Sequence, residues 1–147
     1  MALLLLQLIY VSSAYGPVKS DDLSQILGQS RKNNEKDDIT GLLVFDDGLF
    51  FQVLEGPEDA VKRCFNRIAK DERHGSIALC MESHVEARAF PNWSMGFKRP
   101  EELGEGGLSA VHSIADLQER LGKDLGTDPA VAELTRTILG ITGRVAA

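Results

Sequence analysis

Two residues of this chain stand out by their chemistry, a glutamine inside an apolar strand and a tyrosine in another. Gln52 lies between Phe51 and Val53 in the apolar run from Leu49 to Leu54. A primary amide carries two donors and two acceptor lone pairs, and burying it without partners costs about 1–3 kcal/mol. Gln52 therefore faces a buried polar side chain, a bound ligand or solvent at a strand edge.

Tyr10 lies near the end of the first apolar run, residues 3 to 11. A phenol is one of the few side chains that can give up an electron and then a proton, and its unperturbed pKa of about 10 keeps it neutral at first. A lone tyrosine at a strand end is more often a half-buried core residue. Whether Tyr10 has a functional role therefore depends on the residues that lie beside it in the fold.

The pattern of apolar residues predicts the strands that carry this pair. Residues 3 to 11 are apolar on both faces, which is typical of a central strand covered above and below. The runs 39 to 45 and 49 to 54 flank Asp46, Asp47 and Gly48, a hairpin signal because a type I′ turn needs positive φ at both central residues. Two more strands are expected over residues 76 to 86 and 93 to 98.

Helical spacing of apolar residues predicts two helices between these strands. The first is capped by Ser20 or Asp21 and ends at Asn33 and Asn34. The second begins near Pro57 and carries an apolar stripe that includes Cys64 and Ile68. The order βαββαβ plus one strand is ferredoxin-like. In that topology the first and third strands are central neighbours, which brings Tyr10 and Gln52 together.

The predicted fold class is α+β, a ferredoxin-like βαββαβ sheet with an extra fifth strand and two helices on one face. Its other face is apolar too, so it needs a cover. Residues 101–147 carry two helical stripes, after a break at Gly104 to Gly107. We expect this C-terminal helical pair to cover that face or to exchange with a partner chain. The boundary separates a domain of residues 1–100 from a cap or output extension of residues 101–147.

Composition excludes several classes of protein. The net charge of −6 argues against a nucleic-acid binder, which needs a basic surface. The apolar start, residues 1 to 10, lacks a charged n-region and is too short to span a membrane. Cys64 and Cys80 have no metal spacing and suggest buried thiols in the cytoplasm, with no metal site expected. No Rossmann or Walker glycine motif is present.

Six pieces of the sequence together resemble the BLUF photoreceptors, blue-light sensors that use flavin. They are Tyr10, Ser30 to Asn34, Ile39 to Leu43, Phe51 to Gly56, Asp71 to His74, and Trp93 to Met95. Each piece alone is weak, but they occur in the family's order and spacing over residues 3 to about 99. The tail after residue 100 lies outside the shared domain.

The resemblance implies a flavin between the two helices, expected as FAD, with FMN and riboflavin as alternatives. The cofactor-binding residues it implies are Tyr10, Ile26, Ser30, Asn33, Asn34, Phe50, Gln52, Arg67, Asp71 and His74. The photocycle residues it implies are Tyr10, Gln52, Trp93 and Met95. Light would drive electron and proton transfer from Tyr10 through Gln52 and rearrange hydrogen bonds to the flavin. Either Trp93 or Met95 would face the flavin.

The expected output is a signal to a separate effector protein or a change in self-association, with a homo-oligomer, such as a dimer, as the expected state. We expect no enzyme activity, no nucleic acid and no membrane as partner. Two other interpretations stay open. One is a cofactor-free ferredoxin-like dimeric interaction module. The other is a flavin-dependent redox enzyme, for which the sequence offers no second catalytic pair.

Overall fold

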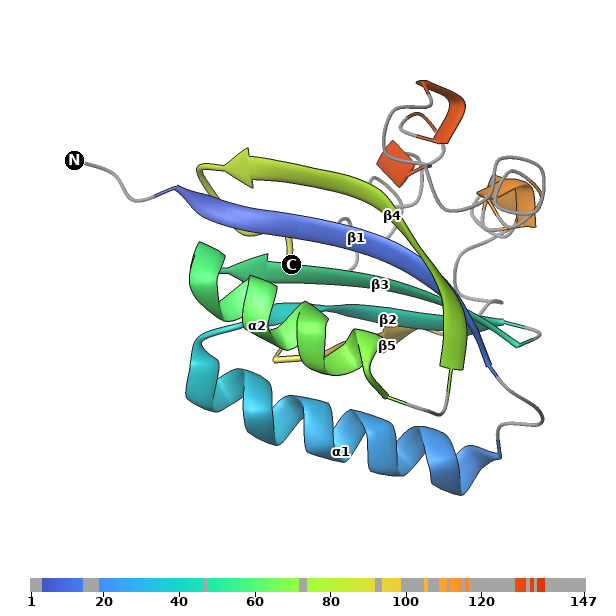
Figure 1. The fold of residues 1–147 in the computed structure, drawn as a ribbon, viewed down its shortest axis with the longest axis horizontal. Helices are drawn as coiled ribbons and strands as arrows, with labels where there is room; N and C mark the ends of the chain where they lie inside the picture. The colour runs from blue at the N-terminus through green and yellow to red at the C-terminus, as the bar shows by residue number, and fades with distance from the viewer. Residues whose placement is uncertain are drawn as a thin grey trace.

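The computed structural model describes most of the sheet and its two helices. The described residues are 4–14, 19–46, 48–71, 74–91, 94–98, 105, 109–110, 112–114, 116, 129–131, 133 and 135–136. The labelled elements of the described residues are, in chain order (Figure 1), β1 (Leu5–Ala14), α1 (Ser20–Asp37), β2 (Thr40–Asp46), β3 (Leu49–Gly56), α2 (Glu58–Ala69), β4 (His74–Val85) and β5 (Gly96–Lys98).

The sheet confirms the predicted α+β, ferredoxin-like class. Its strand order is β4-β1-β3-β2-β5, so β1 and β3 are neighbours at the centre. The first four strands pair antiparallel, whereas β5, three residues long, pairs parallel with β2. The register places Tyr10 of β1 directly opposite Gln52 of β3. The predicted meeting of these two residues is therefore confirmed.

The predicted hairpin between β2 and β3 is present. Asp46 pairs with Leu49, so the connection between the two strands is short and contains Gly48. Gly48 has φ of +80°, a value that glycine adopts without a steric penalty. A short turn fixes the register of the strands it joins. The turn therefore decides which face of the sheet Gln52 occupies.

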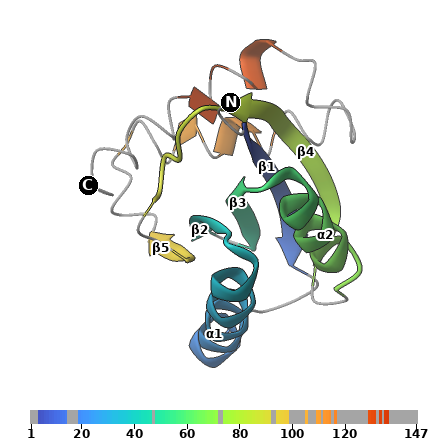
Figure 2. The ribbon, with the colours of Figure 1, turned by 90° about the vertical axis from the view of Figure 1, so that its left-hand side faces the viewer.

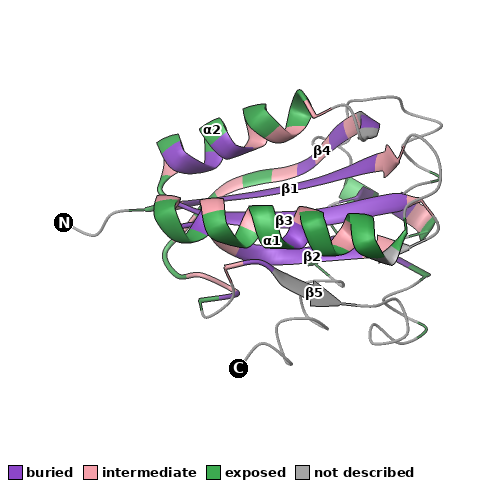
Figure 3. Cartoon of the chain, turned by 90° about the horizontal axis from the view of Figure 1, so that it is seen from below, coloured by how far each residue is buried: buried purple, intermediate pink, exposed green. Residues whose placement is uncertain are grey.

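Two layers cover the sheet, and β1 and β3 are buried along most of their length (Figure 3). Both helices lie on one face (Figure 2), where the core includes Leu6, Leu8, Tyr10, Leu27, Leu43, Phe50, Leu54, Val61 and Met95. The core of the other face includes Ile9, Val11, Leu42, Val44, Phe51, Val53, Cys80 and Phe90, with Ala110, Ile114 and Val131 from the tail. The tail thus supplies cover to the face that the two helices leave open.

The tail is described in part, so the predicted pair of C-terminal helices stays a prediction. Ile114, one member of the first predicted stripe, is buried. Its partners Val111, Ala115 and Leu121 lie outside the residues whose side chains are described. The domain boundary after residue 100 likewise stays a prediction.

The predicted ends of the first helix were wrong. Helix α1 begins after Lys19, whose backbone N–H donates to Asp22, and it continues to Asp37. Asp38 then takes the left-handed conformation at φ of 59°, and its N–H bonds the carbonyl of Asn34. Asparagine tolerates a left-handed helix stop but does not force one, and the residues after it are adequate helix formers. Asn33 and Asn34 consequently lie inside the helix, which fixes the direction of both side chains.

Gly41 in β2 is required by a close approach of the backbone. A Cβ at this position would overlap the carbonyl oxygen of Val53 in β3, and it would lie 3.4 Å from the methyl group of Met95. Glycine is the residue that permits such an approach. Among the described residues, neither α1 nor α2 has the length and apolar content needed to cross a bilayer.

Candidate functional site

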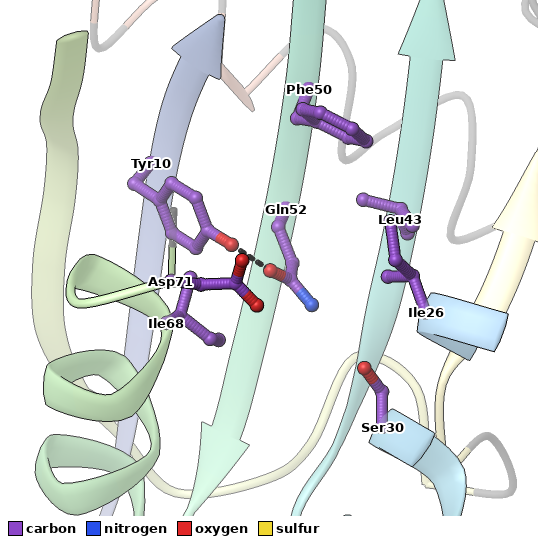
Figure 4. A pocket seen from close by; sticks show the side chains of 8 residues that line it. All are labelled: Tyr10, Ile26, Ser30, Leu43, Phe50, Gln52, Ile68 and Asp71. Atoms are coloured by element: carbon purple, nitrogen blue, oxygen red, sulfur yellow. Dashed lines mark hydrogen bonds between the residues drawn. The ribbon is translucent and has the colours of Figure 1, made fainter. Parts of the chain in front are cut away.

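A hollow between α1, α2 and the central strands is the candidate site (Figure 4). One part, about 480 Å³ including its open mouth, is lined by Tyr10, Ile26, Ser30, Leu43, Phe50, Gln52, Ile68 and Asp71. A part of about 590 Å³ shares several of these residues and adds Gln29, Asn33, Asn34, Cys64 and Arg67.

The structure brings the predicted site residues together. Every predicted cofactor-binding residue except His74 lines one or both parts of the hollow. The backbone of His74 begins β4, but its side chain lies outside the described residues, as does the whole of Trp93. The residues therefore form one site, although they come from β1, α1, β3 and the α2 region.

Sequence reasoning missed four lining residues. Leu43 comes from β2 and Gln29 from α1, whereas Cys64 and Ile68 were assigned to the buried stripe of the second helix. A signal for two of them was present. Gln29 lies four residues before Asn33, and Cys64 lies three residues before Arg67, so each missed residue shares a helix face with a predicted one.

Tyr10 and Gln52 form a buried hydrogen-bonded pair. The Tyr10 hydroxyl donates to Oε1 of Gln52, and the two residues are 2% and 5% exposed. Burial raises the pKa of Tyr10 well above its ordinary value, and the charges of Cys64 and Asp71 raise it further. The phenol therefore keeps its proton at neutral pH and directs it at the amide oxygen.

The nitrogen end of the Gln52 amide binds a weaker hydrogen-bond partner. Its Nε2 donates to Sδ of Met95 over 3.4 Å, and Met95 is 1% exposed. A thioether is a weak acceptor, so the Nε2 end is held less firmly than the Oε1 end. The sequence left open whether Trp93 or Met95 faces the site, and the structure places Met95 against Gln52.

Helix α1 supplies a buried amide to the same site. Asn34 is 2% exposed, and its Nδ2 donates to the carbonyl of Ser94 over 2.8 Å. Its Oδ1 lies 3.8 Å from the thiol of Cys64, which can donate to it. Burial raises the pKa of Cys64, and the nearby guanidinium of Arg67 opposes that shift in part. The thiol therefore stays protonated and serves as a donor.

Polar groups also stand at the mouth of the hollow. Figure 4 shows the carboxylate of Asp71 on the α2 side of Gln52 and the hydroxyl of Ser30 on the α1 side. Arg67 of α2 binds Asp37 of α1 with its guanidinium nitrogen 3.3 Å from the carboxylate. This exposed ion pair joins the two helices beside the opening.

Sequence reasoning also missed the second polar residue buried in β3. Glu55 is 0% exposed and faces away from the hollow, toward the tail-covered side. Its carboxylate accepts from the backbone N–H groups of Ala89 and Phe90 at 2.9 and 2.6 Å. It also accepts from Gln7 at 3.3 Å and Thr40 at 3.2 Å. Glu55 thereby ties the segment after β4 to the centre of the sheet.

The lining suits a flat ligand with an apolar face and a polar edge. Ile26, Leu43, Phe50 and Ile68 provide apolar contacts, while the amides Gln29, Asn33, Asn34 and Gln52 provide donors and acceptors. A ring system with alternating carbonyl and N–H groups needs both kinds of partner. The described residues contain no cluster of three or more His, Cys, Asp or Glu that could hold a metal ion.

Comparison with known proteins gives a consistent result. The family model described as BLUF, sensors of blue-light using FAD, matches residues 5–96. The photoactivated adenylate cyclase subunit beta of Euglena gracilis is 37% identical over 117 residues, which are 79% of this chain. The chain spans 13% of the length of that relative.

Two solved structures share the fold. A bacterial light-regulated adenylyl cyclase aligns with a TM-score of 0.74 at 31% identity, covering 81% of this chain and 36% of that one. The BLUF protein BlrB, in its dark state, aligns with a TM-score of 0.69 at 34% identity. That alignment covers 95% of this chain and 98% of BlrB.

Proposed function

The chain belongs to the BLUF family of blue-light sensors, and we propose that light drives electron and proton transfer from Tyr10 through Gln52. The observation that carries this proposal is the continuous chain of hydrogen bonds from the Tyr10 hydroxyl through the Gln52 amide to the Met95 sulfur. It lies on the wall of a hollow whose lining fits a flavin. The flavin, when bound, supplies blue-light absorption and, once excited, a strong one-electron oxidant.

The residues of the chain can then perform the proton movement. Tyr10 holds its proton in the dark and already points it at Oε1 of Gln52, so no rearrangement is needed before transfer. Gln52 can accept that proton and settle with its two ends exchanged or as a tautomer. Exchange of the two ends would replace the Nε2–H donor with an oxygen facing the Met95 sulfur, whereas the tautomer would leave a single N–H on Nε2. The light signal thus becomes a change in hydrogen bonding that biases a two-state element.

The cofactor is proposed as FAD, with the remaining lining residues holding it. Asn33 and Asn34 offer both donors and acceptors for the carbonyl and N–H edge of the ring. Ile26 and Phe50 would pack near the ring, and Ser30, Arg67, Asp71 and His74 would hold its rim and side chain. FMN and riboflavin satisfy the same edge contacts and stay as alternatives.

The output belongs to the same proposal. Residues 1–100 would form the sensor domain and residues 101–147 the cap or output extension, acting on a separate protein or through self-association of a cytoplasmic homodimer. Met95 would pass the change to the tail. The burial of Ala110, Ile114 and Val131 supports this route, because they belong to one core cluster with residues of the strands that carry Tyr10 and Gln52.

The test is absorption spectroscopy of the purified chain. We expect a yellow protein whose flavin bands shift reversibly to longer wavelength under blue light. The chain should bind flavin and should not consume a reductant, which separates a sensor from a redox enzyme. A colourless protein that takes up no added flavin would contradict the proposal and favour the cofactor-free interaction module.

A further inference from the structure

The backbone that leads into β5 is held by side chains of α1. Pairing between β5 and β2 begins at Gly96, just after Ser94 and Met95. The Ser94 carbonyl accepts from Asn34 at 2.8 Å, and the Met95 carbonyl accepts from Nε of Arg31 at 2.9 Å. Arg31 and Asn34 are three residues apart and therefore lie on one face of α1. Helix α1 thus determines where Met95 enters the site.

Arg31 differs from Asn34 in one useful respect. Asn34 lines the hollow, whereas Arg31 is not among its lining residues. Arg31 is also largely exposed on α1, so replacing it removes little core packing. A substitution at position 31 therefore changes the anchor of Met95 and leaves the flavin contacts in place.

We propose that Arg31 is a positioning residue that holds Met95 against Gln52 in the resting arrangement and sets how fast that arrangement returns after light. This inference rests on the proposed function. Methionine has three rotatable side-chain bonds, so the side chain alone does not stay in one place. A guanidinium N–H that binds a carbonyl is charge-assisted and stronger than a neutral hydrogen bond. The backbone anchor therefore restricts where the sulfur can lie.

The first test compares dark recovery in Arg31→Met, Arg31→Lys and the matched control Lys32→Met, a neighbouring exposed cation on α1. We expect all variants to show the wild-type absorption maximum and red shift, since none touches the hollow. Recovery of Arg31→Met should slow by about fivefold, as expected for the loss of one partly exposed charge-assisted hydrogen bond. Arg31→Lys should recover at an intermediate rate, because its ammonium can still reach the carbonyl.

The second test needs no flavin. Mild peroxide oxidises methionine to the sulfoxide according to its accessibility, and peptide mass spectrometry measures each site separately. Met95 is buried, while Met81 on β4 is partly exposed and serves as an internal reference. We expect Arg31→Met to raise the Met95 oxidation rate several-fold relative to Met81, with a Tm lowered by no more than a few degrees.

The outcomes separate the two proposals. If the wild-type protein shows no red shift, the proposed function fails, and the oxidation ratio still tests whether Arg31 holds Met95. If the wild-type shifts but Arg31→Met recovers at the wild-type rate, the role of Arg31 is wrong. An equal slowing in Lys32→Met, or an unchanged oxidation ratio in Arg31→Met, also overturns it.

Discussion

Strand β3 buries two polar side chains, and they lie on opposite faces of the sheet. Gln52 faces the helices, where the Tyr10 hydroxyl and the Met95 sulfur are its partners. Glu55 faces the tail side, where its carboxylate accepts from two backbone N–H groups and two side chains. Both residues are almost fully buried, at 5% and 0% exposure. Burial alone therefore does not distinguish them.

The difference lies in their partners. Backbone N–H groups cannot rotate away, and four donors leave the carboxylate of Glu55 with little reason to move. An amide can exchange its two ends, and the partners of Gln52 are flexible side chains beside an open hollow. A buried polar group that is saturated by fixed donors stabilises the fold, whereas one with exchangeable partners can act as a switch. Four predictions test this contrast.

The largest effect is expected from Gln52→Leu. It should abolish the light-induced red shift completely, because no amide remains to receive the Tyr10 proton or to change its hydrogen bonds. The free energy of unfolding should fall by about 1–3 kcal/mol, since the Tyr10 hydroxyl loses its acceptor. Absorption spectra before and after illumination, together with urea unfolding, measure both effects. A normal red shift in this variant would contradict the mechanism.

Glu55→Ala should lower stability strongly but leave the light-induced red shift unchanged. It should lower the free energy of unfolding by about 3–5 kcal/mol, because several buried donors lose their acceptor together. Any protein that still folds should keep its red shift, since Glu55 faces away from the hollow. Urea unfolding measures the loss, with the exposed Glu82→Ala on β4 as the matched control. A destabilisation no larger than that of Glu82→Ala would show that the hydrogen bonds to the Glu55 carboxylate contribute little to stability.

The phenol of Tyr10 predicts a dependence of stability on alkaline pH. Because the folded pKa is raised above the unfolded value, the native state holds this proton more tightly. The contribution of this proton to the free energy of unfolding is fully present below a pH of about 10. It is lost as the pH rises above that value toward the folded pKa of Tyr10. Unfolding at pH 8 to 11 should therefore show a steeper loss in the wild type than in Tyr10→Phe. Parallel curves for the two proteins would contradict the raised pKa.

The smallest effect is expected at the exposed ion pair between the helices. Asp37→Asn removes the charge that Arg67 binds at 3.3 Å. Exposed pairs contribute about 0.2–1 kcal/mol, and salt screens them. The change in the free energy of unfolding should therefore be small at low salt and vanish near 1 M salt. A loss as large as that of Glu55→Ala would mean that the pair is far less solvated than its exposure indicates.

Local signals in the sequence predicted most of the fold. The βαββαβ order placed Tyr10 and Gln52 on adjacent central strands, and the structure confirms this and pairs them directly. Helix ends were less predictable, because a residue such as Asn34 permits a left-handed stop without requiring it. Contacts that depend on tertiary packing could not be predicted from the sequence. The backbone donors to Glu55 come from residues 89 and 90, far along the chain, and the contact of Met95 with Gln52 depends on the path of the backbone into β5.

Gly41 gives the Met95 site an unusual property. The methyl group of Met95 lies 3.4 Å from where a side chain at position 41 would begin, so the part of its floor at this position consists of main-chain atoms. Main-chain atoms have no rotamers, and this floor keeps one shape whichever way the neighbouring amide is turned. If Met95 moves in the light as proposed, this part of its surroundings would offer the same backbone surface when it returns.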